Sequence, residues 1–309
     1  MRLLLLFSAL LLPWTLLANG WVLTGPIAPD PVDGWVTEPA NTTLATRHLF
    51  TSAAVGGPVS YHVYLPAAHQ AEPERRFPVL YWLHGSGEGI LGVPAFCQFY
   101  HNAITAGLMP PVIIVFPNGL PTGMWCDSKN GRTPVESLVI NDLIPHIDAT
   151  QRTIATREGR ILEGFSMGGH GAGRLGLKHS HLFRAISMMG AGPLQLDFLE
   201  DDPNLQPLEF RQRLFAEVYG NDMAYYLQQH PWTIAEAQAG SLPEDLRLRI
   251  VIGTEDTMLA NNRLFRDHLT ELGIPHDYIE LEGVGHQPLA TVQSIGPANW
   301  AFYRDVLAP

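Results

Sequence analysis

The apolar and polar positions along this chain form two recurring patterns, one typical of buried strands and one typical of helices. Short, mostly apolar runs occur at 78–83, 111–117, 185–189 and 246–253. Such runs predict central strands of a parallel sheet, because both faces of a parallel sheet are covered. Stretches with helical character follow them, at 94–106, 135–149, 259–272 and 289–307. Strands that alternate with helices indicate an α/β fold, with a mostly parallel sheet and helices on both of its faces.

Two segments of the chain depart from this alternation. Residues 47–52 and 59–66 flank a Gly-Gly turn at 56–57, and the second run alternates apolar and polar residues. This alternation is typical of a half-buried antiparallel strand, so antiparallel strands are expected to precede the parallel ones. Residues 191–245 carry proline, acidic and aromatic residues in no strand pattern, which favours a helical insertion. We therefore expect a single α/β domain over 21–309 that contains this insertion.

The first 20 residues have the pattern of a targeting segment. A positive start at Arg2 precedes an apolar stretch over 3–12, and small residues follow at Ala18 and Gly20. These features are typical of a secretory signal peptide, so residues 1–20 are expected to be removed and the mature protein to be secreted or periplasmic. An uncleaved membrane anchor is the alternative, although the apolar stretch is shorter than the roughly 20 residues that a membrane span requires.

Charge and composition exclude several classes of partner. The chain has 30 acidic and 19 basic residues, a formal net charge of −11, and no basic run. Nucleic acids and anionic membranes are bound by clustered Lys and Arg, so we expect neither as a partner of the mature protein. Hydrophobic residues make up 46% of the chain and charged residues 16%, which suits a large buried core and excludes disorder. No motif implies a metal or an organic cofactor.

The segment 164–168 reads Gly-Phe-Ser-Met-Gly and matches the pattern G-x-S-x-G. An apolar run at 160–163 precedes it and a glycine-rich stretch follows at 169–177, so the motif lies between a predicted strand and a predicted helix. This is the context of a nucleophile elbow, in which a tight turn exposes a serine above the sheet. The alternative is a chance match in a chain with 29 glycines. The context favours the first interpretation, with Ser166 as the nucleophile.

A serine nucleophile needs a histidine base, which in an open parallel sheet lies just after a strand. Among the 13 histidines, His286 follows the last predicted strand, at 276–281, and comes after both Ser166 and Asp256. The resulting chain order of Ser, Asp and His is the one expected for this fold. His84 precedes the serine and is interpreted as an anchor for the loop that carries it. His170 follows Ser166 by one helical turn, so its side chain is expected near the site, where it is a candidate contact for substrate.

The carboxylate that orients the histidine has two candidates. Glu255 and Asp256 both follow the predicted strand at 246–253. We prefer Asp256, because its shorter side chain fits the close contact that an orienting carboxylate makes. Glu255 is then a solvated charge of the loop.

Attack of a serine on a carbonyl group also needs donors for the negative charge that develops on the carbonyl oxygen. The backbone N–H of Met167 is expected to supply one donor, and the N–H of Ser86, in the loop at 84–87, the other. Fixed dipoles of this kind stabilise the transition state selectively. The alternative for the glycines of this loop is an ordinary tight turn.

Several segments together resemble the motifs of one known family. Residues 141–148 read Asn-Asp-Leu-Ile-Pro-His-Ile-Asp, and the serine motif continues to 172 as Gly-His-Gly-Ala. With the segments at 83–85, 117–119, 253–256 and 285–286, which fall in the family's order, the chain resembles the esterase D branch of the α/β-hydrolases over about 45–305. That branch includes S-formylglutathione hydrolases, feruloyl and acetyl-xylan esterases, siderophore esterases and the antigen 85 mycolyltransferases. The resemblance implies the α/β-hydrolase fold and a triad of Ser166, Asp256 and His286.

The resemblance implies a serine esterase that acts on a small-molecule or carbohydrate ester, such as an acetyl or feruloyl ester of plant polysaccharide. The predicted signal peptide argues against a cytosolic role with glutathione esters, and the insertion at 191–245 carries no motif of the family. Two alternatives stay open. One is an acyltransferase that uses the same triad, and the other is a non-catalytic binding protein on the same fold.

Two further expectations concern the loop at 118–134, which follows a central strand and should overhang Ser166 in this fold. Trp125 and Asp127 lie in this loop, and they suit stacking on a sugar or aryl ring with one hydroxyl contact. The alternative is that Trp125 only packs the loop down. Cys97 and Cys126 are expected near the same end of the sheet, which predicts a disulfide in an exported protein. Two free buried thiols are the alternative.

Overall fold

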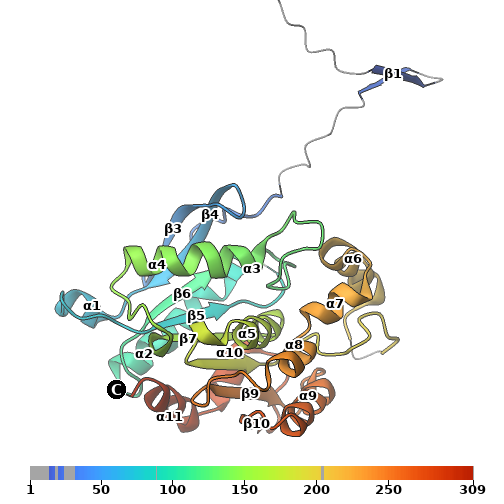
Figure 1. The fold of residues 1–309 in the computed structure, drawn as a ribbon. Helices are drawn as coiled ribbons and strands as arrows, with labels where there is room; N and C mark the ends of the chain where they lie inside the picture. The colour runs from blue at the N-terminus through green and yellow to red at the C-terminus, as the bar shows by residue number, and fades with distance from the viewer. Residues whose placement is uncertain (1–13, 18–19, 24–31, 88, 203–204, 309) are drawn as a thin grey trace, which may run out of the picture. The chain divides into compact units, whose positions relative to one another are not determined.

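The computed structural model describes residues 14–17, 20–23, 32–87, 89–202 and 205–308 (Figure 1). The chain forms two compact units, Met1–Asp33 and Gly34–Pro309. In the first unit, β1 (Trp14–Leu17) pairs antiparallel with β2 (Gly20–Leu23). The signal peptide predicted over residues 1–20 falls largely on residues outside the described ones, so both this segment and export remain predictions.

Within the described part of Gly34–Pro309, eight strands form one sheet in the order β10-β9-β8-β7-β5-β6-β4-β3. They are β3 (Ala45–Ser52), β4 (Gly57–Tyr64), β5 (Val79–Leu83), β6 (Ile113–Pro117), β7 (Arg160–Phe165), β8 (Ala185–Met189), β9 (Arg247–Gly253) and β10 (Asp277–Leu281). β4 pairs antiparallel with both β3 and β6, and the other neighbouring strands are parallel. This confirms the predicted α/β fold with antiparallel strands at its start.

Helices connect the strands and surround the sheet (Figure 1). They are α1 (Ala67–Ala71), α2 (Val93–Thr105), α3 (Val135–Ser137), α4 (Ile144–Thr150), α5 (Met167–Lys178), α6 (Leu208–Tyr219), α7 (Met223–Gln229), α8 (Pro231–Gln238), α9 (Leu259–Glu271), α10 (Pro288–Ser294) and α11 (Pro297–Val306). A π-helical segment, η2 (Leu138–Leu143), joins α3 to α4, and short 3₁₀ turns lie at η1 (Gly89–Leu91), η3 (Arg157–Gly159) and η4 (Ser180–Leu182). Helices α6, α7 and α8 all lie within 191–245.

The two faces of the sheet can be followed along β8. Ala185 and Met189 belong to the buried core that α2 and α11 share. Ile186 and Met188 point the other way, toward α5, because successive residues of a strand face opposite sides. A Cβ atom at Gly173 or Gly176 of α5 would lie 2.5 Å from side-chain atoms of Met188 or Ile186. The glycines therefore let α5 pack closely against the sheet.

The last predicted helix is interrupted in the structure. The apolar pattern predicted a single helix over 289–307, whereas the structure has α10 and α11 with a break at Gly296. Gly296 has a φ of 61°, a left-handed conformation that glycine adopts at little cost, and Pro297 begins the next helix. The helical periodicity of the apolar residues continues across this break, which is why the pattern does not reveal it.

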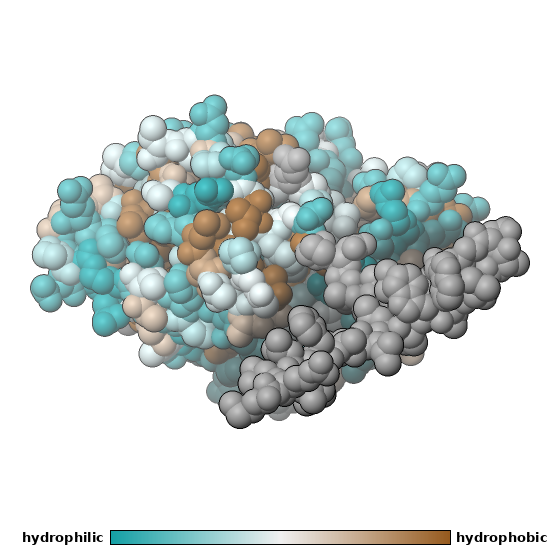
Figure 2. Space-filling view, turned by 90° about the horizontal axis from the view of Figure 1, so that it is seen from above, coloured by the Kyte–Doolittle hydropathy of each residue, from teal (hydrophilic) through white to brown (hydrophobic). Residues whose placement is uncertain are grey.

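The exposed large apolar side chains among the described residues come from separate parts of the chain, for example Leu49, Leu91 and Leu264. On the face shown in Figure 2, hydrophobic residues form small groups among hydrophilic ones. In the part of the chain that the structure describes, no helix is both long enough and apolar enough to cross a membrane. Nor does this part contain a group of three or more His, Cys, Asp or Glu side chains placed to hold a metal ion.

Candidate active site

Ser166 lies at the junction between β7 and α5, in a strained conformation. Its φ is 58° and its ψ is −121°, outside the regions that a residue with a side chain prefers. Backbone hydrogen bonds hold it there: its N–H donates to the carbonyl of Met189 at 2.9 Å, and its own carbonyl accepts from the N–H groups of His170 and Gly192. Strain of this kind collects at functional sites, where the surroundings enforce it. The turn therefore has the geometry expected of a nucleophile elbow.

The two glycines of the motif are required by close backbone contacts. A Cβ atom at Gly164 would lie 2.4 Å from the carbonyl oxygen of Gly168. A Cβ atom at Gly168 would lie 1.9 Å from the carbonyl oxygen of Leu83, at the end of β5. Because backbone atoms cannot move aside like the end of a side chain, the turn can form only with glycine at these positions.

We predict that Gly168→Ala lowers the free energy of unfolding by at least about 2 kcal/mol, because the added methyl group overpacks the junction of β5 and α5. Gly240→Ala is the matched control, since a Cβ atom at Gly240 meets nothing within 4 Å. Urea denaturation of both variants and the unaltered protein measures the difference. If Gly168→Ala were as stable as Gly240→Ala, the close approach to Leu83 would not constrain the fold.

Ser166, His286 and Asp256 form one chain of hydrogen bonds. The Oγ of Ser166 lies 2.9 Å from Nε2 of His286, and Nδ1 of His286 lies 2.7 Å from Oδ2 of Asp256. The Asp256 carboxylate accepts a hydrogen bond from the Nδ1–H of His286. The imidazole proton is therefore on Nδ1, and Nε2 is free to accept the serine proton. The three residues follow β7, β10 and β9 at the carboxyl edge of the sheet.

The two candidate carboxylates differ in burial. Asp256 is 4% exposed, and its Oδ1 accepts a hydrogen bond from the N–H of Met258 at 2.9 Å. Glu255 is exposed to solvent. A Cβ atom at Gly253 would lie 1.9 Å from the carbonyl oxygen of Val284, so the loops that carry Asp256 and His286 are closely packed. The structure thus brings Asp256, and not its neighbour, to the histidine.

The loop after β5 lies directly against the serine. A Cβ atom at Gly85 would lie 3.2 Å from Cβ of Ser166, and Ser86 follows in the wall of the adjoining cavity. The His84 ring fixes this loop: Nε2 accepts from the N–H of Gly119 at 3.1 Å, and Nδ1 donates to the carbonyl of Gly85 at 2.7 Å. Burial lowers the pKa of His84, which keeps the ring neutral for this arrangement. These contacts fit the role expected of His84 as an anchor.

Met167 is the first residue of α5, and its backbone N–H belongs to the first turn of that helix. The N–H groups of a first helical turn have no partner within the helix, so this one is available to a ligand beside Ser166. The pairing of Met167 with Ser86 as donors for a carbonyl oxygen remains a prediction. The closeness of Gly85 to Ser166 favours the functional interpretation of the loop glycines over an ordinary tight turn.

The prediction that Trp125 stacks on a substrate is wrong. Trp125 is 0% exposed, and its Nε1 donates to the carbonyl of His84 at 3.1 Å. Its ring lies so close to Gly119 and Gly171 that a Cβ atom at either position would clash with it. Met124 and Trp125 have φ values of 50° and 53°, and this turn carries the indole beneath the loop. From this pair of residues, it is Met124 that lines the cavity.

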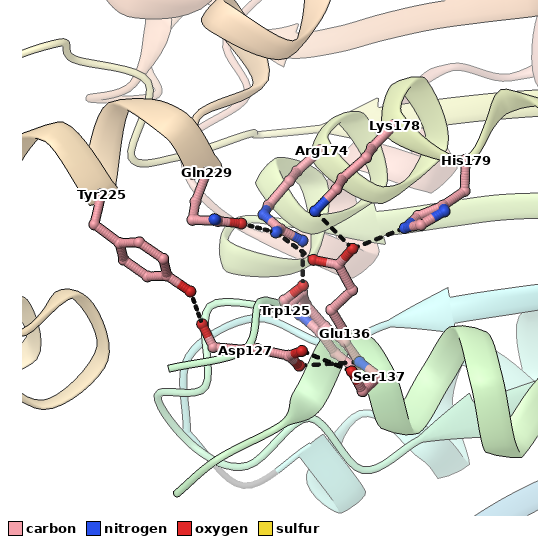
Figure 3. Close-up of polar contacts among 9 residues, drawn as sticks. All are labelled: Trp125, Asp127, Glu136, Ser137, Arg174, Lys178, His179, Tyr225 and Gln229. Carbon is pink, nitrogen blue, oxygen red and sulfur yellow. Dashed lines mark hydrogen bonds and ion pairs between the residues drawn. The ribbon is translucent and has the colours of Figure 1, made fainter. Parts of the chain in front are cut away.

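Asp127 makes hydrogen bonds within the protein and does not line the cavity, so the predicted substrate contact is also wrong. Its Oδ1 accepts from the N–H of Ser137 at 2.9 Å and its Oδ2 from the Ser137 hydroxyl at 2.6 Å, at the start of the helical segment that follows the loop (Figure 3). Its backbone carbonyl accepts from the Tyr225 hydroxyl at 2.8 Å. Asp127 therefore ties the loop to α3 and to α7, away from the cavity.

A buried arginine connects the same loop to the helix behind Ser166. Arg174 of α5 donates to the carbonyl of Trp125 at 3.0 Å and to the side chains of Glu136 and Gln229 (Figure 3). Burial acts to raise the pKa of Glu136, but hydrogen bonding to His179 and the charge of Arg174 outweigh it and hold this pKa well below its usual range. The network joins α3, α5, α7 and the loop at 118–134 into one support for the site.

His170 is buried, and the prediction that it contacts substrate is wrong. It is 1% exposed, it does not line the cavity, and its ring faces His230 with 5.7 Å between the ring centroids. On α5, one turn beyond Ser166, the side chain points back into the core. Burial and the charges of His230 and Arg174 lower the pKa of His170 well below its ordinary value. Burial also lowers the pKa of His230 to about 3.

These shifts predict acid sensitivity. An unfolded chain protonates His230 near its ordinary pKa of about 6.5, whereas the folded protein does not until about pH 3. Between these values the unfolded state binds more protons, so the free energy of unfolding decreases as the pH falls, by about 1.4 kcal/mol per pH unit for one such group. His230→Asn can still accept a hydrogen bond from the N–H of Trp232. We expect its free energy of unfolding, measured by urea denaturation, to decrease less steeply between pH 6.5 and 4.5 than that of the unaltered protein. Parallel curves for the two proteins would contradict this assignment.

The predicted disulfide is wrong, because Cys97 and Cys126 are both free and buried. Cys97 belongs to the core beneath α2, on one face of the sheet. Cys126 belongs to the loop at 118–134, and its buried side chain lies near Arg174 of α5, on the other face. Burial raises the pKa of each thiol to about 12, so both stay protonated. The two free thiols that the sequence reasoning kept as an alternative are what the structure contains.

A cavity of about 360 Å³ opens beside Ser166 and His286. One part of the wall lies outside the segment 191–245 and carries mainly apolar side chains: Trp82, Phe96, Met124 and Phe165. Another part of the wall comes from the segment 191–245, again mainly with apolar side chains: Phe198, Leu205, Phe210 and Leu214. A cavity of this size and lining suits a small molecule with an apolar portion.

Comparisons with known proteins agree with this geometry. A family model described as putative esterase matches residues 52–286. Esterase Rv1288 from Mycobacterium tuberculosis (strain ATCC 25618 / H37Rv) is 31% identical over 261 residues, an alignment that covers 77% of this chain and 54% of the relative. This chain therefore spans about half the length of that relative. The endo-1,4-beta-xylanase/feruloyl esterase of Xylanibacter ruminicola is 29% identical over 160 residues, covering 49% of this chain and 22% of that protein.

Among solved structures, a ferulic acid esterase has a similar fold, with a TM-score of 0.70 at 23% identity over 85% of this chain and 98% of the other. An S-formylglutathione hydrolase from Agrobacterium tumefaciens has a TM-score of 0.69 at 17% identity, over 87% and 98% of the two chains. These likenesses show the α/β-hydrolase fold. The family match extends from β3 to His286 and includes the elbow at Ser166, and it confirms the resemblance seen in the motifs: the chain belongs to the putative esterase family.

Proposed function

We propose that this protein is a serine carboxylic ester hydrolase in which Ser166, His286 and Asp256 act as the triad. The observation that carries this proposal is the hydrogen-bonded chain from Ser166 Oγ to His286 Nε2, at 2.9 Å, and from His286 Nδ1 to Asp256, at 2.7 Å. This chain lies at a cavity beside a strained serine, in a member of an esterase family. A nucleophile, its base and an orienting carboxylate are what acyl transfer to serine requires.

In the first half of the proposed reaction, the Oγ of Ser166 attacks the ester carbonyl while His286 Nε2 takes the hydroxyl proton. The carbonyl oxygen becomes negative and accepts hydrogen bonds from the N–H groups of Met167 and Ser86. His286 then gives its proton to the leaving alcohol as the ester C–O bond breaks, and the acyl group remains on Ser166. Asp256 holds the imidazole in the tautomer that these transfers need and stabilises the imidazolium that forms.

In the second half, a water molecule takes the place of the alcohol. His286 removes a proton from the water, the hydroxide attacks the acyl-enzyme carbonyl, and the same backbone donors receive the oxygen. Collapse releases the carboxylic acid and returns the proton from His286 to Ser166. An acyltransferase would differ only in using an acceptor alcohol in place of water.

The proposed substrates are esters of modest size, with acetyl or feruloyl esters of carbohydrate as the leading class. Support comes from the largely apolar cavity and from two relatives, one named a feruloyl esterase and one a ferulic acid esterase. The signal-like segment at residues 1–20 supports action outside the cytoplasm, on material that the cell exports or meets.

The proposal is tested with purified mature protein and four esters: p-nitrophenyl acetate, butyrate and octanoate, and methyl ferulate. We expect turnover of at least one ester by the unaltered protein and none above background by Ser166→Ala. Hydrolysis that persists in Ser166→Ala would refute the assigned nucleophile, and a lack of turnover on the whole panel would refute this substrate class. Adding an acceptor sugar and analysing the products separates hydrolysis from acyl transfer.

A further inference from the structure

Part of the cavity wall that comes from the segment 191–245 is built on irregular backbone. In the described part of 194–207 there is neither helix nor strand, yet Phe198, Leu205 and Gln206 of this segment line the cavity. Turns within this segment satisfy the carbonyls of Asp197, Glu200 and Asp202 only with single N–H donors, and its other carbonyls need donors from elsewhere, because buried carbonyls without donors are costly. Something else must hold this wall in place.

Arg211, in the first turn of α6, makes the contacts that do so. Its Nε donates to the carbonyl of Gln206 at 2.8 Å, its Nη1 to that of Phe198 at 2.7 Å, and its Nη2 to that of Glu200 at 2.9 Å. The side chain is itself 4% exposed and lies in the cavity wall. All three acceptors are backbone carbonyls of the same irregular segment, so the guanidinium holds this segment at three points.

The charge of this segment adds a second reason for a cation at this position. Glu200 is close enough to Asp197 and Asp202 that, besides burial, their charges raise its pKa, while the charge of Arg211 lowers it. The guanidinium therefore offsets part of the repulsion among these carboxylates. Arg is suited to this position because its five N–H donors are held in a rigid planar fork, whereas Lys offers a single ammonium group.

We propose that Arg211 is the positioning residue that holds residues 198–200 and 205–206 as part of the wall of the substrate cavity, and that it thereby selects esters with a large apolar group. This inference rests on the proposed ester hydrolysis. An acetyl ester needs little beyond the triad and the donors near Ser166, and all of these residues lie outside the segment 191–245. A larger apolar group must pack against Phe198, Leu205 and the neighbouring side chains of α6, and their positions depend on the segment that Arg211 holds.

The test compares Arg211→Ala and Arg211→Lys with the unaltered enzyme on p-nitrophenyl acetate and p-nitrophenyl octanoate. Arg152→Ala is the matched control, because Arg152 also donates to two backbone carbonyls, those of His69 and Glu72, but precedes β7 at the opposite end from Ser166. We expect both Arg211 variants to raise KM for the octanoate at least about tenfold and to leave kcat/KM for the acetate within about threefold. Arg152→Ala is expected to change neither.

Equal losses on the two esters in the Arg211 variants would overturn the proposal, and so would the same octanoate effect in Arg152→Ala. If Arg211→Ala does not yield folded protein, Arg211→Lys and Arg211→Gln carry the same comparison, since neither can reach all three carbonyls. Failure of the underlying function has a different outcome, namely that the unaltered enzyme hydrolyses neither ester.

Discussion

Ser166→Ala and His286→Ala are each expected to lower kcat by at least about 10³-fold, and the double variant is expected to be little worse than either single one. The reason is the hydrogen bond of 2.9 Å between Ser166 Oγ and His286 Nε2, which makes the two side chains one unit. Once the nucleophile is missing, the base has no proton to accept. Once the base is missing, the hydroxyl is a poor nucleophile at neutral pH.

Steady-state kinetics on the most rapidly hydrolysed ester of the panel measure the three variants, and denaturation curves serve as the control for folding. Losses that multiply in the double variant would show that Ser166 and His286 contribute separately. That result would contradict a shared mechanism even if each single variant were inactive.

Asp256→Asn is expected to reduce kcat by about 10³-fold or more, whereas Glu255→Gln is expected to stay within about twofold of the unaltered enzyme. The amide cannot accept and orient the Nδ1–H of His286 as the carboxylate does, so the histidine loses its correct tautomer. Glu255 is exposed and lies next to Asp256 in sequence, which makes its substitution a close control for disturbance of the loop. A larger loss in Glu255→Gln would show that the orienting carboxylate is the neighbour.

The fold and the core of the site were predictable because they depend on local patterns. The run at 185–189 is β8 itself, and the other parallel strands differ from their predicted bounds by one or two residues. Such runs are buried on both faces, so their composition identifies them directly. Ser166, Asp256 and His286 each follow one of these strands, and parallel strands bring their carboxyl ends to one edge.

The features that the sequence did not reveal depend on contacts between distant segments. Trp125 is buried because left-handed backbone at Met124 and Trp125 turns the indole under the loop, and nothing in the composition of the loop indicates this. Cys97 and Cys126 follow neighbouring strands, but the face of the sheet on which each lies depends on the path of the chain. Arg211 gains its role from carbonyls in a segment that has no pattern of its own.

The central claim is that Ser166 becomes acylated, and the most direct measurement is mass spectrometry of the protein after reaction with a serine-directed fluorophosphonate. The account predicts one label per chain, carried by the peptide that contains Ser166, with loss of ester hydrolysis in proportion to labelling. His286→Ala should label far more slowly, because the hydroxyl then lacks its base. Full loss of activity with Ser166 unlabelled, or with the label on another residue, would contradict the proposed mechanism.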